Sequence, residues 1–351
     1  MNTLEIENTN APFLSVIIPV YNSENYVQKA VESVISQSDG DWELIIVNDG
    51  STDGSERIIT RLVDEHKDKK IIYIQSENRG PSSARNIGIN AASGRYVCFL
   101  DSDDQYNRNL LRSLKTIGEE YDICYFGWIE IDERDGKVLS KYSERYGFIN
   151  DVEDGISFAK KKYLRKQWIC NCNAIYKRKL IEEYQITYPE GIYDGEDACF
   201  IYKALIHARR VVCLPEDYFV NIYREDSLMH ASFSTKNMTL IPAAYELVQY
   251  GEQHVIDIEL KNMLESNYMD GIITVAKRMA VSYKWTEIMQ FISSVHRNLP
   301  YINGRVDAKW ISKKTYFMIL LYKCCLPLFF LTCKTYYTFI ISNRAFGKNN
   351  R

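Results

Sequence analysis

The chain has 351 residues, of which 46% are apolar and 25% are charged, with 17 glycines and 8 prolines. This composition is typical of globular proteins and excludes disordered, collagen-like and repeat architectures. The net charge of −3 is too close to neutral for a chain that neutralises nucleic-acid phosphates, so we expect no nucleic-acid partner. The length predicts two domains, or one domain with an extension.

The first hundred residues contain four short runs rich in Ile and Val. These runs are apolar throughout rather than alternating, which is typical of strands buried on both faces. We expect strands at Leu14–Val20, Glu43–Asn48, Lys70–Gln75 and Tyr96–Leu100.

Three segments between these strands have apolar residues about every 3.6 positions and predict helices. They cover Ser23–Gln37, Asp53–Val63 and Ser82–Ala92. Ser23 is expected to cap the first helix, and Asp53 or Ser55 the second. The alternation predicts an α/β fold with a parallel, Rossmann-like sheet, whose ligands bind at the carboxyl ends of the strands.

The pattern from Tyr121 to Tyr223 is mixed, and no Pro/Gly/Ser linker separates it from the first half. Strands are expected at Ile123–Ile131 and Ala174–Lys177, and helices at Asp151–Leu164 and Asp197–His207. Beyond Lys236 the pattern is helical, with Ile256–Val281 as its longest amphipathic stretch. We therefore expect an N-terminal tail (1–12), two halves of one α/β domain (13–128 and 129–235) and a helical extension (236–351).

The nine cysteines are an odd number and form no C-x-x-C pair. They are interpreted as reduced, mostly core residues in a cytosolic compartment. The first twelve residues lack the basic and apolar regions of a signal peptide, so we expect a cytoplasmic location.

Three carboxylates follow the fourth predicted strand directly: Asp101, Asp103 and Asp104. They repel one another unless a cation is present. Hard oxygen ligands suit Mg²⁺ or Mn²⁺, which keep sites free for phosphate oxygens. An alternative is that Asp103 or Asp104 caps a helix beginning near Asn107.

Two absent motifs narrow the nucleotide class. The chain has no G-x-G-x-x-G after its first strand and no G-x-x-x-x-G-K-[ST], which argues against dinucleotide oxidoreductases and P-loop NTPases. A nucleotide must be held otherwise: Asp49 is able to accept hydrogen bonds from a base or ribose, Tyr21 to stack, and Arg85 to reach phosphate. Taken singly, they also fit a turn residue, a buried aromatic and a solvated helix residue.

Three segments in order, SVIIPVYNSENYVQKAVESVISQ, DWELIIVNDGSTDGS and NRGPSSARNIGINAASGRYVCFLDSDD, resemble the inverting family 2 glycosyltransferases with the GT-A fold. The resemblance covers residues 13 to about 128 and extends more weakly to about 226. It implies that residues 13–128 bind a nucleotide-diphosphate sugar, usually a uridine sugar, and that residues 129–235 bind the acceptor.

The resemblance also implies roles for individual residues. The nucleoside pocket would be lined by Pro19, Tyr21, Glu24 and Asp49. Arg79 and Arg85 would lie near the diphosphate, Asp101 near the ribose with Ser102 beside it, and Asp103 would coordinate the metal.

The second half must supply a base, because inverting transfer needs a carboxylate near the acceptor hydroxyl. The segment GIYDGEDACFIY resembles the family's E-D segment, so Asp197 is assigned as base and Glu196 as a neighbour that orients substrate. Asp194 is a competitor, and an N-cap pair at a helix start is the alternative.

Three further features complete the resemblance. Tyr223-Arg224-Glu225-Asp226-Ser227 resembles the family's Y-R-x-x-S segment, which places Arg224 near the diphosphate. Trp168 and Asn173 lie where the family often has acceptor-side residues. The Q-x-x-R-W signature of processive members is absent, which favours transfer of a single sugar.

The C-terminal tail is basic, with nine Lys or Arg against one acid from Arg305 to Arg351. Residues 315–341 are apolar and aromatic, but their longest uncharged stretch is ten residues, too short to span a bilayer. We expect peripheral contact with an anionic membrane through residues 313–348. The alternative is a helix packed on the catalytic domain or on a dimer partner.

Together these features predict a metal-dependent inverting glycosyltransferase that acts on a saccharide or lipid-linked saccharide in surface-polysaccharide synthesis. The alternatives are a metal-dependent nucleotidyltransferase and a non-catalytic nucleotide-sugar-binding or membrane scaffold protein. The sequence is compatible with an oligomer.

Overall fold

The computed structural model describes residues 11–118, 121–224, 234–282, 286–287, 290, 313–325, 327–333 and 335. The chain divides into two compact units. Unit 1 contains Met1–Gly191 and Glu196–His230, and unit 2 contains Ile192–Gly195 and Ala231–Arg351. Within the described ranges, no helix is both long enough and apolar enough to cross a membrane.

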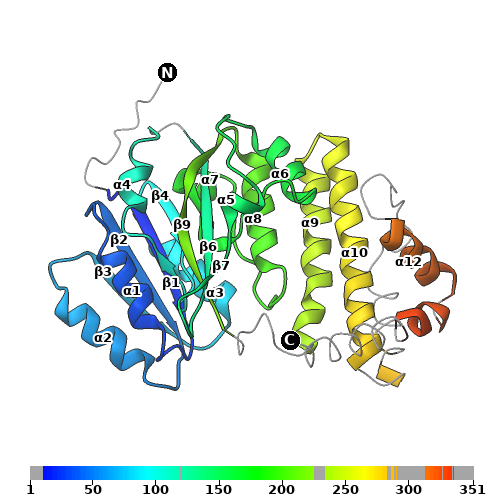
Figure 1. Cartoon of the computed structure of the whole chain (residues 1–351), viewed down its shortest axis with the longest axis horizontal. Helices are drawn as coiled ribbons and strands as arrows, with labels where there is room; N and C mark the ends of the chain where they lie inside the picture. The colour runs from blue at the N-terminus through cyan, green and yellow to red at the C-terminus, as the bar shows by residue number, and fades with distance from the viewer. Residues whose placement is uncertain are drawn as a thin grey trace. The chain divides into compact units, whose positions relative to one another are not determined.

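Unit 1 is built on one nine-stranded sheet of order β3-β2-β1-β4-β8-β6-β9-β5, with β7 paired to β6 (Figure 1). The first four strands are parallel, β8 runs antiparallel to both β4 and β6, and β9 runs parallel to β6. All six predicted strands are confirmed to within one residue at each end. The strands are β1 (Leu14–Val20), β2 (Trp42–Asp49), β3 (Ile71–Ser76), β4 (Tyr96–Phe99), β5 (Gln105–Tyr106), β6 (Ile123–Asp132), β7 (Val138–Lys141), β8 (Ala174–Lys177) and β9 (Val211–Tyr223).

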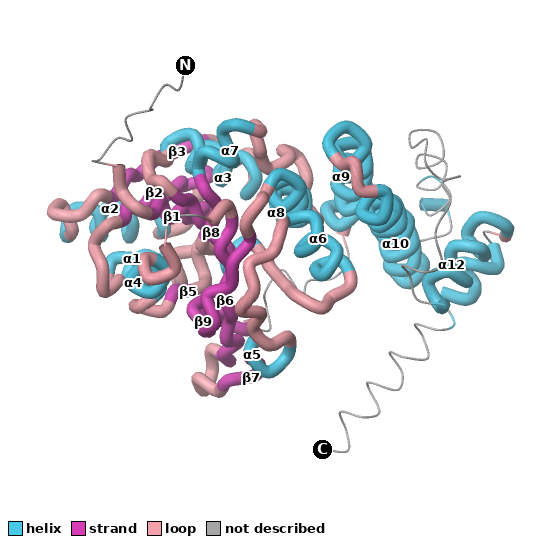
Figure 2. Tube along the Cα trace, turned by 90° about the horizontal axis from the view of Figure 1, so that it is seen from above, coloured by secondary structure: helices cyan, strands magenta, loops and turns pink. Residues whose placement is uncertain are grey.

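The helices of unit 1 also follow the predicted order. They are α1 (Val27–Ile35), α2 (Ser55–Glu65), α3 (Pro81–Ala91), α4 (Leu110–Leu114), α5 (Tyr142–Arg145), α6 (Gly155–Tyr163), α7 (Arg178–Glu183) and α8 (Glu196–His207), with a 3₁₀ turn η1 at Asn171–Asn173. In unit 2, the 3₁₀ turn η3 (Thr235–Thr239) leads into α9 (Leu240–His254), and α10 (Ile258–Ser282) lies beside α9 in both views (Figures 1 and 2). Helix α12 covers Lys313–Cys324, and residues 327–333 are also helical.

The predicted start of the first helix is wrong. Its N-cap is Tyr26, and the carbonyl of Ser23 accepts from the N–H groups of Tyr26 and Val27 in a turn that precedes the helix. The predicted cap of the second helix is also wrong: its N-cap is Gly54, although the Asp53 carboxylate accepts from the N–H of Ser55 at 3.0 Å. At the first helix, Ser23 is held by contacts with distant loops, which no local pattern reveals.

Strand β1 is covered on both faces, as its continuous apolar run predicts. Val16, Ile18 and Val20 face a buried cluster that includes residues of α1 and α2. Ile17 points the other way, toward Gly88 of α3, where an added Cβ would lie 2.3 Å from its side chain. The helices therefore cover both faces of the sheet, which leaves the carboxyl ends of the strands as the place for a site.

Helix α6 packs against α8, which carries the predicted base, and Gly155 lies at this contact. A Cβ on Gly155 would lie 1.9 Å from the carbonyl oxygen of Leu205. Backbone does not yield to such overlap, so we expect Gly155→Ala to lower the free energy of unfolding by about 2–3 kcal/mol, as overpacking does. Urea unfolding measures this; the control is Gly40→Ala, which meets nothing within 4 Å. Equal midpoints for the two variants would contradict the close packing.

Candidate functional site

The centre of the site is Arg85, a residue of α3 that is 5% exposed. Its Nη2 donates to Asp101 Oδ1 at 2.9 Å, and its Nη1 donates to Glu196 Oε1 at 3.4 Å. Asp101 follows β4, and Glu196 is the first residue of α8. One buried cation therefore joins two segments: the acidic loop that contains Asp101, Asp103 and Asp104, and the predicted base segment at the start of α8. The alternative that Arg85 is a solvated helix residue is wrong.

Two buried neighbours that the sequence analysis did not identify support this arginine. With its amide oriented to satisfy both ends, Asn171 accepts from Arg85 Nε at 2.9 Å and from Nη2 at 3.2 Å, and donates to the Tyr188 hydroxyl. The guanidinium carbon lies 5.3 Å from the centre of the Tyr188 ring. Burial alone would lower the pKa of Arg85, but the charge of Asp101 and its other anionic neighbours raises it, so the cation is permanent.

A second arginine closes the other side of the acidic loop. Short strand β5 pairs antiparallel with β9, with Gln105 opposite Val220, and this pairing brings the end of β9 to the loop. There Arg224 forms an ion pair with Asp103, and its guanidinium lies 4.2 Å from the Tyr26 ring centre.

The third carboxylate of the loop, Asp104, is buried. It accepts from the N–H of Ile222 at 2.9 Å and from Asn221 Nδ2 at 3.4 Å. The alternative that Asp103 or Asp104 caps the following helix is wrong, because α4 begins at Leu110 and its N-cap is Asn109.

The acidic loop has the chemistry of a cation site. Burial and the charge of Asp101 raise the pKa of Asp103, although Arg224 opposes this. Burial and both neighbouring carboxylates raise the pKa of Asp104 well above its ordinary value. Ligand atoms of Asp101, Asp104 and Cys172 lie within 4.8 Å of one another. Burial and these anions raise the pKa of the Cys172 thiol, so the carboxylates are the hard ligands that fit Mg²⁺ or Mn²⁺.

The predicted nucleoside residues lie at or just beyond the carboxyl ends of β1 and β2. Asp49 accepts from the backbone N–H groups of Arg79 at 2.9 Å and Gly80 at 2.8 Å, and is 3% exposed. It therefore fixes the turn after β3, where Gly80 has φ +91°. Tyr21 is 49% exposed, so the alternative of a buried aromatic is wrong.

Four further residues were predicted on the donor side: Pro19, Glu24, Arg79 and Ser102. Pro19 lies in β1, and the hydroxyl of Ser102 lies 2.7 Å from that of Ser23. Glu24 accepts from the N–H of Gly54 at 2.7 Å, whereas the side chain of Arg79 extends into solvent. The nucleoside and diphosphate roles of these residues stay predictions.

The base segment opens α8. Asp197 Oδ1 accepts from the N–H of Ala198 at 2.6 Å. Burial and the charge of Asp197 raise the pKa of Glu196, while Arg85 lowers it. The competitor Asp194 belongs to unit 2, where it accepts from Asn237 Nδ2 at 3.2 Å.

Lys162, which the sequence analysis did not identify, is a buried cation whose charge interacts with that of Asp197. Its Nζ donates to the carbonyl of Ile169 at 2.9 Å and lies 4.3 Å from the Trp168 ring centre. Burial lowers the pKa of Lys162, while the charge of Asp197 acts in the opposite direction. Trp168 is partly exposed over this lysine, whereas Asn173 is fully buried and donates to the carbonyl of Phe126 at 2.7 Å.

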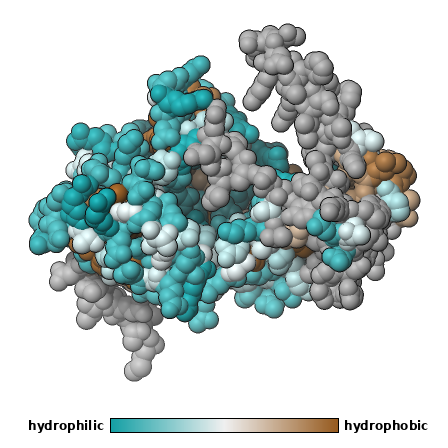
Figure 3. Space-filling model, turned by 90° about the horizontal axis from the view of Figure 1, so that it is seen from below, coloured by the Kyte–Doolittle hydropathy of each residue, from teal (hydrophilic) through white to brown (hydrophobic). Residues whose placement is uncertain are grey.

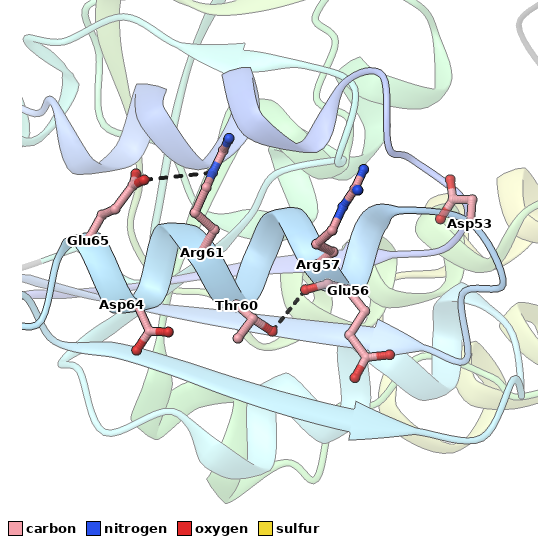
Figure 4. A pocket seen from close by; sticks show the side chains of 7 residues that line it. All are labelled: Asp53, Glu56, Arg57, Thr60, Arg61, Asp64 and Glu65. Carbon is pink, nitrogen blue, oxygen red and sulfur yellow. Dashed lines mark hydrogen bonds and ion pairs between the residues drawn. The ribbon is translucent and has the colours of Figure 1, made fainter.

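A shallow depression on α2 is a separate feature (Figure 4). Within it, Arg61 pairs with Glu65 at 3.8 Å, and Arg61 also donates to Gln28 of α1 at 2.8 Å. It contains none of the predicted site residues, so it is a solvated helix surface. The depression is lined by Asp53, Glu56, Arg57, Thr60, Arg61, Asp64 and Glu65.

Comparison with known proteins agrees with this architecture. Residues 15–185 match the family model described as glycosyl transferase family 2. The fold resembles the crystal structure of Staphylococcus aureus TarS 1–349 in complex with UDP-GlcNAc, with a TM-score of 0.71 over 93% of this chain and 91% of that one, at 20% identity. The predicted α/β GT-A fold with a C-terminal helical extension is confirmed.

Two relatives extend the comparison. Glycosyltransferase GlyA of Streptococcus pneumoniae is 33% identical over 224 residues, which are 61% of this chain and 31% of the relative. The minor teichoic acid biosynthesis protein GgaA of Bacillus subtilis is 31% identical over 283 residues, or 73% of this chain and 60% of the relative. The chain thus spans about a third to somewhat over half of these relatives.

The buried state of Asp104 predicts a pH-dependent effect on stability. Because its pKa is raised in the folded state, its ionised form destabilises the fold at pH above that value, and the penalty vanishes below the unfolded-state pKa. Asp104→Asn retains an acceptor for Ile222. We expect it to raise the melting temperature by about 2–4 °C at pH 8 in EDTA, and the gain to shrink toward pH 4.

The matched control is Asp64→Asn, which alters an exposed carboxylate on α2 and should show no such trend. A melting temperature below wild type for Asp104→Asn at pH 8 would show that its hydrogen bonds outweigh its burial.

Proposed function

Since residues 15–185 of this chain belong to glycosyltransferase family 2, we propose that the protein transfers one sugar from a nucleotide-diphosphate sugar to a saccharide or lipid-linked saccharide acceptor, with inversion. The observation that carries this proposal is the Arg85 bridge between Asp101 and Glu196. It couples a cation-binding acidic loop to a carboxylate pair at a helix start, and transfer needs both.

The nature of the substrates is supported by the comparisons. TarS, which shares the fold, was solved with UDP-GlcNAc and with UDP, so a uridine sugar is the proposed donor. The name of GgaA refers to minor teichoic acid biosynthesis, which supports an acceptor in surface-polymer assembly. We place the reaction at the cytoplasmic face of the membrane, and the absent processive signature supports single transfer.

The divalent cation is proposed to lie at the acidic loop. Asp101 and Asp103 are the open ligands, because each side chain is 38% exposed, whereas Asp104 is buried and held by N–H donors. A bound Mg²⁺ or Mn²⁺ would neutralise charge on the diphosphate leaving group. Arg224, beside Asp103, and Arg85, beside Asp101, are placed to add positive charge on the same side.

The protein's own chemistry is then assigned to Asp197. As the acceptor oxygen bonds to the anomeric carbon, the bond from that carbon to the diphosphate oxygen breaks and the diphosphate leaves with the electron pair. The acceptor's hydroxyl proton passes to Asp197. The N–H of Ala198 and the start of α8 stabilise the carboxylate of Asp197, and Glu196, restrained by Arg85, orients the acceptor.

The role of Asp197 has a direct test. Asp197→Asn removes the proton acceptor but keeps the side-chain size, so we expect turnover to fall about 100-fold or more with nearly unchanged donor binding. The assay measures UDP release from the uridine sugar that gives the largest thermal shift. Asp194→Asn is the matched control and should stay within about twofold of wild type. If Asp194→Asn loses as much activity as Asp197→Asn, Asp197 is not the base.

The cation site has a second test. Asp103→Ala is expected to weaken Mn²⁺-dependent UDP binding by about 10-fold or more, because it removes an open hard ligand. Calorimetric titration of UDP at several Mn²⁺ concentrations measures this, with Asp64→Ala as the surface control. Unaltered Mn²⁺ dependence in Asp103→Ala would assign the cation to Asp101 and Asp104 instead.

A further inference from the structure

The end of unit 2 has two apolar faces rather than one. The inner face packs α12 and the segment after it into the unit, where α12 contacts α10. The buried side chains of this face are Met318, Ile319, Tyr322, Phe329, Phe330 and Cys333. The alternative of a helix packed on the protein thus accounts for one face only.

The outer face of the same segment is also apolar and is open to solvent. Phe317 is 56% exposed, Leu320 43%, Leu328 46% and Leu331 59%. Figure 3 shows a patch of hydrophobic surface toward the right of that view. Other exposed large apolar residues of the described chain are single or paired, such as Val152. A patch of this kind normally marks an interaction surface.

The charge of the sequence that contains this patch indicates its partner. From residue 308 to the C-terminus the sequence contains eight Lys or Arg and no Asp or Glu. A second copy of the chain, docked on the same patch around a two-fold axis, would bring an equally basic segment against the first. An anionic lipid surface complements both the charge and the apolar side chains.

We propose that the outer face of α12 and of residues 327–333 docks onto an anionic membrane surface, with the apolar side chains inserted among the lipids and the basic residues at the headgroups. Helix α12 has only 12 residues, so this segment lies in the interface instead of crossing it. The docking goes beyond sugar transfer and does not require it, so either proposal can fail without the other.

The first experiment uses the full chain and 100-nm vesicles of phosphatidylcholine, alone or with 30% phosphatidylglycerol. We expect co-sedimentation to be about 10-fold stronger with the anionic vesicles and to weaken in 0.5 M NaCl. An environment-sensitive fluorophore on the exposed Cys324 and Cys325 should shift to the blue only with anionic vesicles. Equal binding to both vesicle types, or no binding, would overturn the proposal.

The second experiment removes the apolar part. The triple variant Phe317→Ser, Leu320→Gln, Leu331→Gln should lower the vesicle partition coefficient about 100-fold, with unchanged UDP release in solution. The matched control is Ile256→Gln, Ile258→Gln, which alters two exposed apolar residues elsewhere in unit 2 and should bind as wild type. Unchanged vesicle binding by the triple variant, or loss of a dimer in sedimentation velocity instead, would assign the face to another partner.

Discussion

The buried charge of Arg85 is the interaction on which the candidate site depends. It is the counter-ion of two carboxylates more than ninety positions apart, Asp101 and Glu196. A guanidinium at this depth has lost its hydration, and only ion pairs together with hydrogen bonds to Asn171 offset that loss. The acidic loop after β4 and the start of α8 therefore keep a common position, because neither can move without leaving a buried charge unpaired.

A second buried arginine, Arg224, pairs with another carboxylate of the acidic loop, Asp103. The pairing of β5 with β9 brings Arg224 to the loop, where it forms this ion pair. Arginines flank the loop on both sides, while Asp104 is held by N–H donors and retains a raised pKa. Carboxylates that are crowded and buried in this way favour a divalent cation. In the proposed function, a diphosphate would then lie near three positive charges: the cation, Arg85 and Arg224.

Unit 2 has a surface of a different kind. One face of α12 is used for folding, and the other leaves large apolar side chains in water, in a stretch whose sequence is basic. Leaving such side chains exposed costs free energy unless a partner covers them. The proposed lipid surface would cover them and, if sugar transfer occurs as proposed, would hold the protein near lipid-linked acceptors.

The amino-acid sequence by itself determined six of the nine strands, the helices between the first four strands and the acidic loop after β4, and its resemblance to a known family implied the GT-A fold. The six strands and these helices follow from local apolar patterns, which depend on neighbours within a few residues. Strands β5, β7 and β9 were not predicted. Only the tertiary structure decided that Asp49 binds the turn at Gly80, that Asn171 holds Arg85 and that Lys162 is buried near Asp197. Each of these contacts joins residues about thirty or more positions apart, and their partners are selected by packing and burial, which no local pattern encodes.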